Sequence, residues 1–169
     1  MKKLFRLKTC VAVSSVLALV FTAVPVQAHT YYFAMASDDT MFVAVDIDSI
    51  KDIGDNKKSA EIVVIYNGAR YDGTTKYAVA MARYDCKNHT ADSKLRQNYD
   101  ASGTLVRTIP YRDADSDFQP VYPDSIAEWQ LIAVCDGVSA TTQGFSKSFD
   151  GVQTMITVLD GFYVSRHPK

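Results

Sequence analysis

The sequence predicts an α+β fold, in which a five- or six-stranded antiparallel sheet packs against one C-terminal helix and carries one disulfide. Residues 77–86 alternate in side-chain character with a period of two, which is typical of a strand. Residues 125–135 form an apolar run that begins with a helix-capping pattern. The two segments end in Cys86 and Cys135, so a disulfide can join the strand to the helix.

The first 28 residues have the composition of a secretory signal peptide. Residues 1–8 hold four cations and no acid, an apolar stretch follows at 11–24, and Val26-Gln27-Ala28 has the small residues of a cleavage site. The apolar stretch is shorter than the roughly 20 residues that span a membrane, and a retained anchor is the alternative. We expect cleavage after Ala28, loss of Cys10 with the signal, and no membrane span in the rest of the chain.

Removal of 28 of the 169 residues leaves 141, the size of one domain with a single core. The signal takes four of the 18 basic residues and none of the 19 acidic ones, which leaves 14 against 19 and a formal charge of −5. Lys57-Lys58 is the only adjacent basic pair in this part, and a solvated turn accounts for it. The charge balance argues against nucleic acid or an anionic membrane surface as the principal partner.

Cys86 and Cys135 are the only cysteines outside the signal. Export places them in an oxidising compartment, where two cysteines allow one intramolecular pairing. Closing a loop of about 50 residues removes roughly 4 kcal/mol of unfolded-state entropy in the chain model. We expect a Cys86–Cys135 disulfide, and a pair of free buried thiols is the alternative.

The N-terminal part of the mature chain reads as strands. Residues 31–36 and 41–46 are aromatic or apolar and flank a polar turn, which predicts two antiparallel strands. Residues 51–58 are polar and predict a loop, and the β-branched segment 60–66 predicts a third strand. In segment 77–86, one side carries mainly alanines and Cys86, which leaves space for a helix to pack over it.

The second half of the chain contains a predicted hairpin and a predicted helix. Residues 94–99 and 104–109 are strand-like and flank the turn 100–103. The polar segment 110–123 then leads to a capping box formed by Ser125 and Glu128. We expect the buried face of this helix to hold Ile126, Trp129, Ile132 and Ala133, and its end to lie at Gly137.

The signals are weaker after Gly137. Residues 138–148 are mostly small and polar, which predicts a linker or mobile loop. Residues 152–164 could add a strand after that linker. The predicted organisation is therefore a signal peptide at 1–28, a folded domain at 29–137, and a C-terminal extension of uncertain structure at 138–169.

With these segments in place, the chain resembles the bacterial surface-adhesin protein E family over roughly residues 31–135. Five short segments carry the resemblance through their order and spacing: 45–50, 83–86, 99–103, 118–125 and 134–135. The resemblance implies an antiparallel sheet with a C-terminal helix, the Cys86–Cys135 disulfide, and export in a bacterium with an outer membrane. The chain differs from the family pattern at Phe118, where the family usually has tryptophan, and in the 34 residues that follow Cys135.

No catalytic constellation is visible in the sequence. A nucleophile–histidine pair would require His89 beside Cys86, whose sulfur is expected to be oxidised. No His/Cys group has the spacing of zinc ligands. We expect no enzyme activity and no cofactor.

One acidic segment resembles the start of a calcium loop. Asp113, Asp115 and Asp117 stand at alternate positions, but the sixth position is Phe118 rather than glycine and the twelfth is Asp124 rather than glutamate. A solvated acidic loop is the alternative to a weak calcium site.

The ten tyrosines all lie outside the signal. A tyrosine side chain combines an apolar ring with a polar hydroxyl group, which suits a surface that contacts proteins. The alternative is that most of the tyrosines pack in the core. The family resemblance implies a non-enzymatic binding protein in the periplasm or at the cell surface. It further implies a surface adhesin that contacts host or matrix proteins and can form a homodimer. The alternative is a periplasmic small-ligand-binding or envelope-stress protein.

Overall fold

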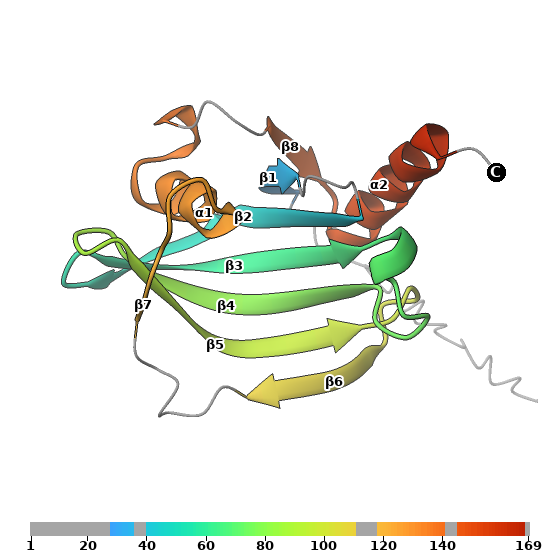
Figure 1. The fold of residues 1–169 in the computed structure, drawn as a ribbon, viewed down its shortest axis with the longest axis horizontal. Coiled ribbons are helices and arrows are strands. Elements are labelled where there is room, and N and C mark those ends of the chain that lie inside the picture. The colour runs from blue at the N-terminus through green and yellow to red at the C-terminus, as the bar shows by residue number, and fades with distance from the viewer. Residues whose placement is uncertain (1–27, 36–39, 111–117, 141–144, 168–169) are drawn as a thin grey trace, which may run out of the picture.

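The computed structural model describes residues 28–35, 40–110, 118–140 and 145–167, which form one antiparallel sheet and two α-helices (Figure 1). The sheet order is β6-β5-β4-β3-β2-β1-β8, and β7 pairs with β5. The strands are β1 His29–Met35, β2 Met41–Gly54, β3 Lys57–Tyr66, β4 Tyr77–Asp85, β5 Thr90–Tyr99, β6 Leu105–Pro110, β7 Gln119–Pro120 and β8 Phe145–Phe149. The helices are α1 Ile126–Cys135 and α2 Val152–Arg166, with short 3-10 turns η1 Gly68–Arg70 and η3 Val138–Ala140.

The α+β class and the antiparallel sheet are confirmed, but the described sheet has eight strands rather than five or six. The two additional strands, β7 and β8, are short. The predicted antiparallel pairing of the first two strands is confirmed by β1 and β2, and the predicted hairpin is confirmed by β5 and β6. At the β5–β6 turn, Asp100 Oδ1 accepts hydrogen bonds from the backbone N–H groups of Ser102 (2.8 Å) and Thr104 (2.9 Å).

The predicted polar loop at 51–58 is wrong, because β2 and β3 continue through it to a two-residue turn. Lys51 pairs with Ser59 and Asp52 with Lys58. The turn residues Asp55 and Asn56 have φ angles of 52° and 59°, which match the twist of a tight hairpin. The hairpin tip is exposed on both faces, so its strands need no apolar residues.

Helix α1 begins at a capping arrangement close to the predicted one. Ser125 Oγ accepts a hydrogen bond from the Glu128 N–H (3.1 Å), and Glu128 Oε2 accepts from the N–H of Asp124 (2.7 Å), one residue before the cap. The predicted buried face is partly wrong. Leu131, Ala133 and Val134 are buried, whereas Ile126, Trp129 and Ile132 are half-buried. The helix is apolar around most of its last turns, so spacing alone does not fix its buried side.

Two apolar clusters lie on opposite faces of the sheet. Because side chains alternate along a strand, Phe42 and Ala44 of β2 face one cluster while Val43 and Val45 face the other. The α1 cluster contains Val43, Val45, Ala60, Ile62, Ala82, Tyr84, Leu131 and Val134. The α2 cluster contains Tyr31, Phe33, Phe42, Ala44, Val63, Ile65, Tyr77, Phe149, Met155, Ile156 and Leu159. The predicted helix over the alanine side of β4 is therefore confirmed, and a second helix covers the other side.

Two predictions for the C-terminal extension are wrong. Within the predicted linker 138–148, the described residues form η3 and most of β8, and β8 pairs antiparallel with β1. Residues 152–164, predicted as a strand, belong to α2. Their β-branched residues favour a strand by propensity, but Met155, Ile156 and Leu159 fall on one helical face and are buried against the sheet.

The disulfide between Cys86 and Cys135 is present, with the two Cα atoms 5.5 Å apart. It ties the end of α1 to the turn after β4. Next to it, Lys58 Nζ donates to the carbonyl oxygens of Val134 (3.1 Å) and Cys135 (3.0 Å). A cation at the C-terminal end of a helix is favoured by the helix dipole. Lys58 thus has a structural role rather than lying in a solvated turn.

Candidate functional site

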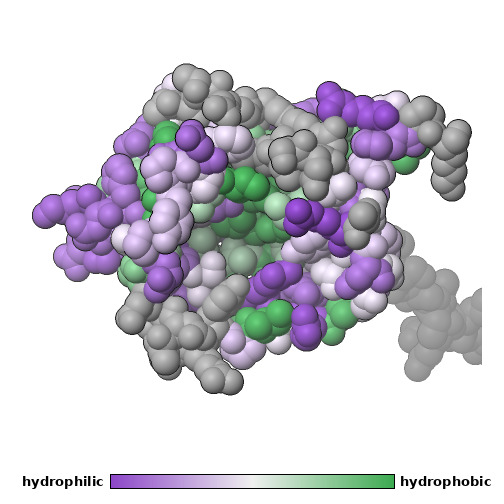
Figure 2. All heavy atoms as spheres, viewed as in Figure 1, coloured by the Kyte–Doolittle hydropathy of each residue, from purple (hydrophilic) through white to green (hydrophobic). Residues whose placement is uncertain are grey.

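Each helix covers only half of its face of the sheet. α1 packs near the β2–β3 turn, and α2 packs towards the opposite end, as Figure 1 shows. The molecule is hollowed in the middle of the view in Figure 2, with apolar residues on the floor and polar residues around it. A hollow with an apolar floor and a polar border is typical of a binding site.

A cavity of about 230 Å³ lies at the end of β3, on the half of the sheet that α1 leaves uncovered. Strand pairing explains how β5 and β6 contribute to it, since Asn98 lies opposite Arg107 and Arg96 lies opposite Ile109. Arg96 and Asn98 are two residues apart and therefore share one face of the sheet. The cavity is lined by Tyr66, Arg70, Asp72, Thr75, Arg96, Asn98 and Arg107.

The arginine on β5 is held in a fixed orientation. Arg96 Nη2 donates to the hydroxyl oxygen of Tyr66 (2.6 Å), and Arg96 Nε donates to Asn98 Oδ1 (3.0 Å). The guanidinium carbon also lies 6.0 Å from the centre of the Tyr66 ring. Side chains held in this way lose less conformational freedom when they bind a ligand.

The charges around the cavity are unequal. Among the described residues that line the cavity, three are arginines, Arg70, Arg96 and Arg107, and one is a carboxylate, Asp72. The pKa of Asp72 is lowered, chiefly by the hydrogen bond from the backbone N–H of Thr75 and next by that from the backbone N–H of Thr74. This carboxylate therefore stays ionised. Guanidinium groups bind carboxylates and other planar or tetrahedral anions through paired N–H donors. The cavity is suited to an anionic group.

Comparison with known protein families gives a match to surface-adhesin protein E over residues 31–136. The chain belongs to the surface-adhesin protein E family. The match includes all seven residues that line the cavity and both cysteines, and it ends one residue after α1. β8 and α2 therefore lie outside the matched region. No curated protein and no solved structure matched the chain.

Several residues that the sequence patterns single out lie away from the cavity or outside the described residues. Asp113, Asp115 and Asp117 fall outside the described residues, so the calcium loop stays a prediction. His89 lies at the β4–β5 turn, and Cys86 is in the disulfide. None of the described helices combines the length and the apolar composition needed to cross a bilayer. The expected homodimer also remains a prediction.

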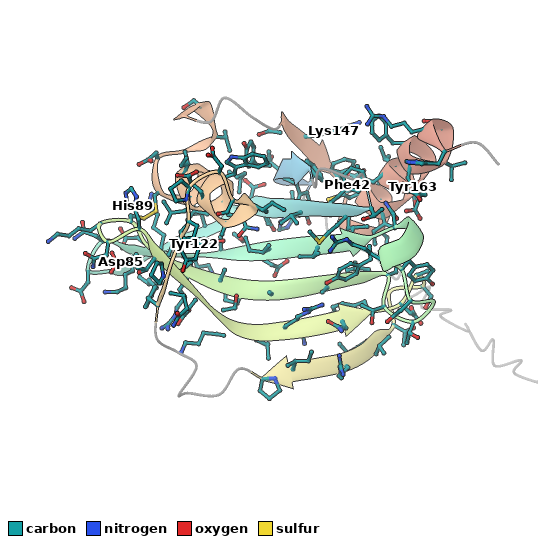
Figure 3. All side chains as sticks on the ribbon, viewed as in Figure 1. Phe42, Asp85, His89, Tyr122, Lys147 and Tyr163 are labelled. Carbon is teal, nitrogen blue, oxygen red and sulfur yellow. A yellow bond between two sulfur atoms is a disulfide. The ribbon has the colours of Figure 1, made fainter. Side chains whose placement is uncertain are left out.

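The tyrosines divide between core and surface. Tyr31, Tyr32, Tyr77 and Tyr84 are buried, which supports the packing role for these four. Tyr122 is the most exposed of the described tyrosines, with 73% of its surface accessible, and Figure 3 places it at the same end of the molecule as His89. Tyr122 follows β7 and is far from the cavity along the sheet.

Sequence reasoning missed the arginine cavity of this family member. Its three arginines are separated along the chain, and none stands in a basic cluster. Part of the cavity could have been predicted, because the predicted hairpin of 94–99 and 104–109 places Arg96, Asn98 and Arg107 on neighbouring strands. The contribution of Arg70 depends on η1, whose position relative to β5 follows only from the folded sheet.

Proposed function

We propose that this chain is an exported, non-enzymatic binding protein that acts as a surface adhesin and contacts host or matrix proteins. The arginine cavity is the contact site, and it takes an acidic side chain of the partner. The observation that carries this proposal is the cavity of three guanidinium groups inside the region that matches the adhesin family. Family membership supports the adhesin role, and the cavity supports the chemistry of the contact.

A protein partner is favoured over a small anion by what surrounds the cavity. The hollow beside it has apolar residues on its floor, and protein interfaces combine an apolar centre with arginine and tyrosine contacts (Figure 2). A cavity of about 230 Å³ accommodates a single side chain. Arg96 and Tyr66, already joined by a hydrogen bond, are the residue types that most often dominate binding energy at interfaces.

The first experiment measures binding of the purified mature protein to immobilised basement-membrane extract by biolayer interferometry. Arg107 is exposed on β6 and makes no hydrogen bond to another described residue, so Arg107→Glu reverses a charge in the cavity with little risk to the fold. We expect this variant to bind at least about tenfold more weakly. Lys87→Glu, an exposed change at the β4–β5 turn, is the matched control and should bind like the wild type.

The second experiment determines location, by treating intact cells with protease and probing for the protein. Cleavage in intact cells supports the adhesin proposal. Protection in intact cells, with cleavage after the outer membrane is opened, would contradict it. The cavity would then favour the alternative function, a periplasmic protein that binds a small carboxylate or phosphate.

A further inference from the structure

A second polar cluster lies on the other face of the sheet, next to Tyr31 and Phe149 of the α2 cluster. It consists of His29 at the start of β1 and of Asp46 and Asp48 on β2. One ligand atom from each of the three side chains lies within 4.8 Å of the others. His29 Nδ1 is 2.7 Å from Asp46 Oδ2. His29 and Asp46 are 17 positions apart in the sequence, so spacing rules do not reveal this cluster, and the β1–β2 pairing creates it.

The backbone fixes both carboxylates of the cluster. The N–H of Thr30 donates to Asp48 Oδ2 (2.6 Å), and the N–H of Asp48 donates to Asp46 Oδ1 (3.1 Å). The register of β2 on β3 shifts between Asp46 and Lys51. Such irregularities redirect side chains and are frequent beside functional sites. The cluster is therefore attached to rigid strands rather than to a loop.

Negative charge exceeds positive charge at this place. The Asp46 side chain is only 3% exposed, and Glu61 lies directly opposite it on β3. Among the described residues, His29 is the only base that forms an ion pair with Asp46 or Asp48. A bound cation would reduce this repulsion.

The predicted cleavage after Ala28 supplies a further donor, because His29 then becomes the first residue of the mature chain. Its α-amino nitrogen and its Nδ1 can close a chelate ring on one metal ion. An α-amino group has a pKa near 8, so a metal ion competes with the proton at neutral pH with little difficulty. Two nitrogen and two carboxylate donors are a ligand set that zinc accepts in tetrahedral geometry.

We propose that His29, Asp46 and Asp48 bind a divalent transition-metal ion of the zinc type, with the α-amino group of mature His29 as the fourth ligand. Binding fixes the mature N-terminus to the sheet. The site is independent of the adhesin proposal, since it lies on the opposite face from the arginine cavity. It stabilises the fold by mass action, because the unfolded chain does not hold the three side chains together.

The test is calorimetric titration of the exported protein with zinc chloride after treatment with a chelator. Mass spectrometry first establishes that the chain begins at His29. We expect one equivalent of zinc to bind and the melting temperature to rise. His29→Ala and Asp48→Asn should each weaken binding at least about tenfold. Asp55→Asn is the matched control, because Asp55 is an exposed turn residue whose positive φ suits asparagine.

Two outcomes would overturn the proposal. One is the absence of zinc binding, and the other is wild-type affinity in both His29→Ala and Asp48→Asn. A form with one extra alanine ahead of His29 keeps the imidazole but moves the amino group. Unchanged zinc affinity in this form would contradict the amino group as a ligand. Calcium chloride should bind much more weakly than zinc, since calcium prefers oxygen donors, and equal affinity would contradict the assignment to a zinc-type metal.

Discussion

The two helices cover opposite faces of one sheet, but they are attached to it in different ways. α1 has ten residues and is joined to the sheet by the Cys86–Cys135 disulfide and by the contact of Lys58 with its last carbonyls. α2 has fifteen residues and is held by packing and by polar contacts such as Lys76–Asp160. The family match includes α1 and ends before α2. Each helix has three buried residues, so the covalent link, rather than the number of buried side chains, distinguishes the attachment of α1 from that of α2.

The largest effect is expected from removing the link to α1. The double variant Cys86→Ser/Cys135→Ser opens a loop with a sequence separation of 49 residues. The free energy of unfolding should fall by about 4 kcal/mol, because the unfolded chain gains entropy. Urea unfolding followed by circular dichroism measures this. A loss below about 1 kcal/mol would mean that packing alone holds α1.

The second prediction compares core truncations in the two helices. Met155 of α2 and Leu131 of α1 are both buried, and each change to alanine should cost about 2–5 kcal/mol. Because α2 has no covalent link, Met155→Ala should also lower hydrogen-exchange protection throughout α2 while β3 and β4 stay protected. Leu131→Ala should leave α1 attached through its disulfide. Equal loss of protection in α1 and α2 would remove the distinction between them.

A third, smaller effect should come from the ion pair beneath α2. Lys76 Nζ is buried and donates to Asp160 Oδ1 (2.6 Å) and to Asn67 Oδ1 (2.6 Å). Asp160→Ala should cost about 1–3 kcal/mol, since a buried ammonium loses its charged partner but keeps the acceptors Asn67 Oδ1 and the Tyr66 carbonyl oxygen. Asp160→Asn retains an acceptor and should cost less. Thermal unfolding of the two variants gives the difference. Equal costs would exclude a contribution from the uncharged acceptor, and an Asp160→Asn variant as stable as the wild type would exclude a role for the charge.

The smallest expected effect is a loss of folding stability at acidic pH. The pKa of Asp100 at the β5–β6 turn is lowered, chiefly by the Ser102 hydroxyl and then by the backbone N–H of Thr104. A lowered folded-state pKa stabilises the fold above the unfolded value near 4, and this contribution is lost as the pH falls through the folded pKa. Stability should therefore decrease as the pH falls below about 4. Asp100→Asn should flatten this decrease in urea titrations, and an unchanged slope would exclude the turn as its source.

Local signals made the α1 layer predictable. The capping pattern at Ser125 and Glu128, the alternation in β4 and the two cysteines all lie in short segments, and each was sufficient for its element. α2 was missed because Thr154, Ile156, Thr157 and Val158 favour a strand, while the choice of helix depends on packing against Phe33 and Phe149.

The two candidate sites could be predicted less well than the fold. Arg70 reaches the cavity through η1, and His29 meets Asp46 through strand pairing, so both sites depend on contacts between distant segments. The Arg96–Arg107 half of the cavity follows from a hairpin that the sequence does predict. The sequence does not reveal these two clusters because no short motif contains the residues that meet in each of them.

The adhesin assignment is tested most directly by counting cells that attach to a surface coated with basement-membrane extract. The cells carry the wild-type protein, Arg107→Glu or Lys87→Glu at equal levels, and a strain without the protein gives the background. The account predicts that wild-type and Lys87→Glu cells attach equally and that Arg107→Glu cells fall close to background. Equal attachment of all three would contradict the arginine cavity as the contact site, and attachment no better than background with the wild-type protein would contradict adhesion itself.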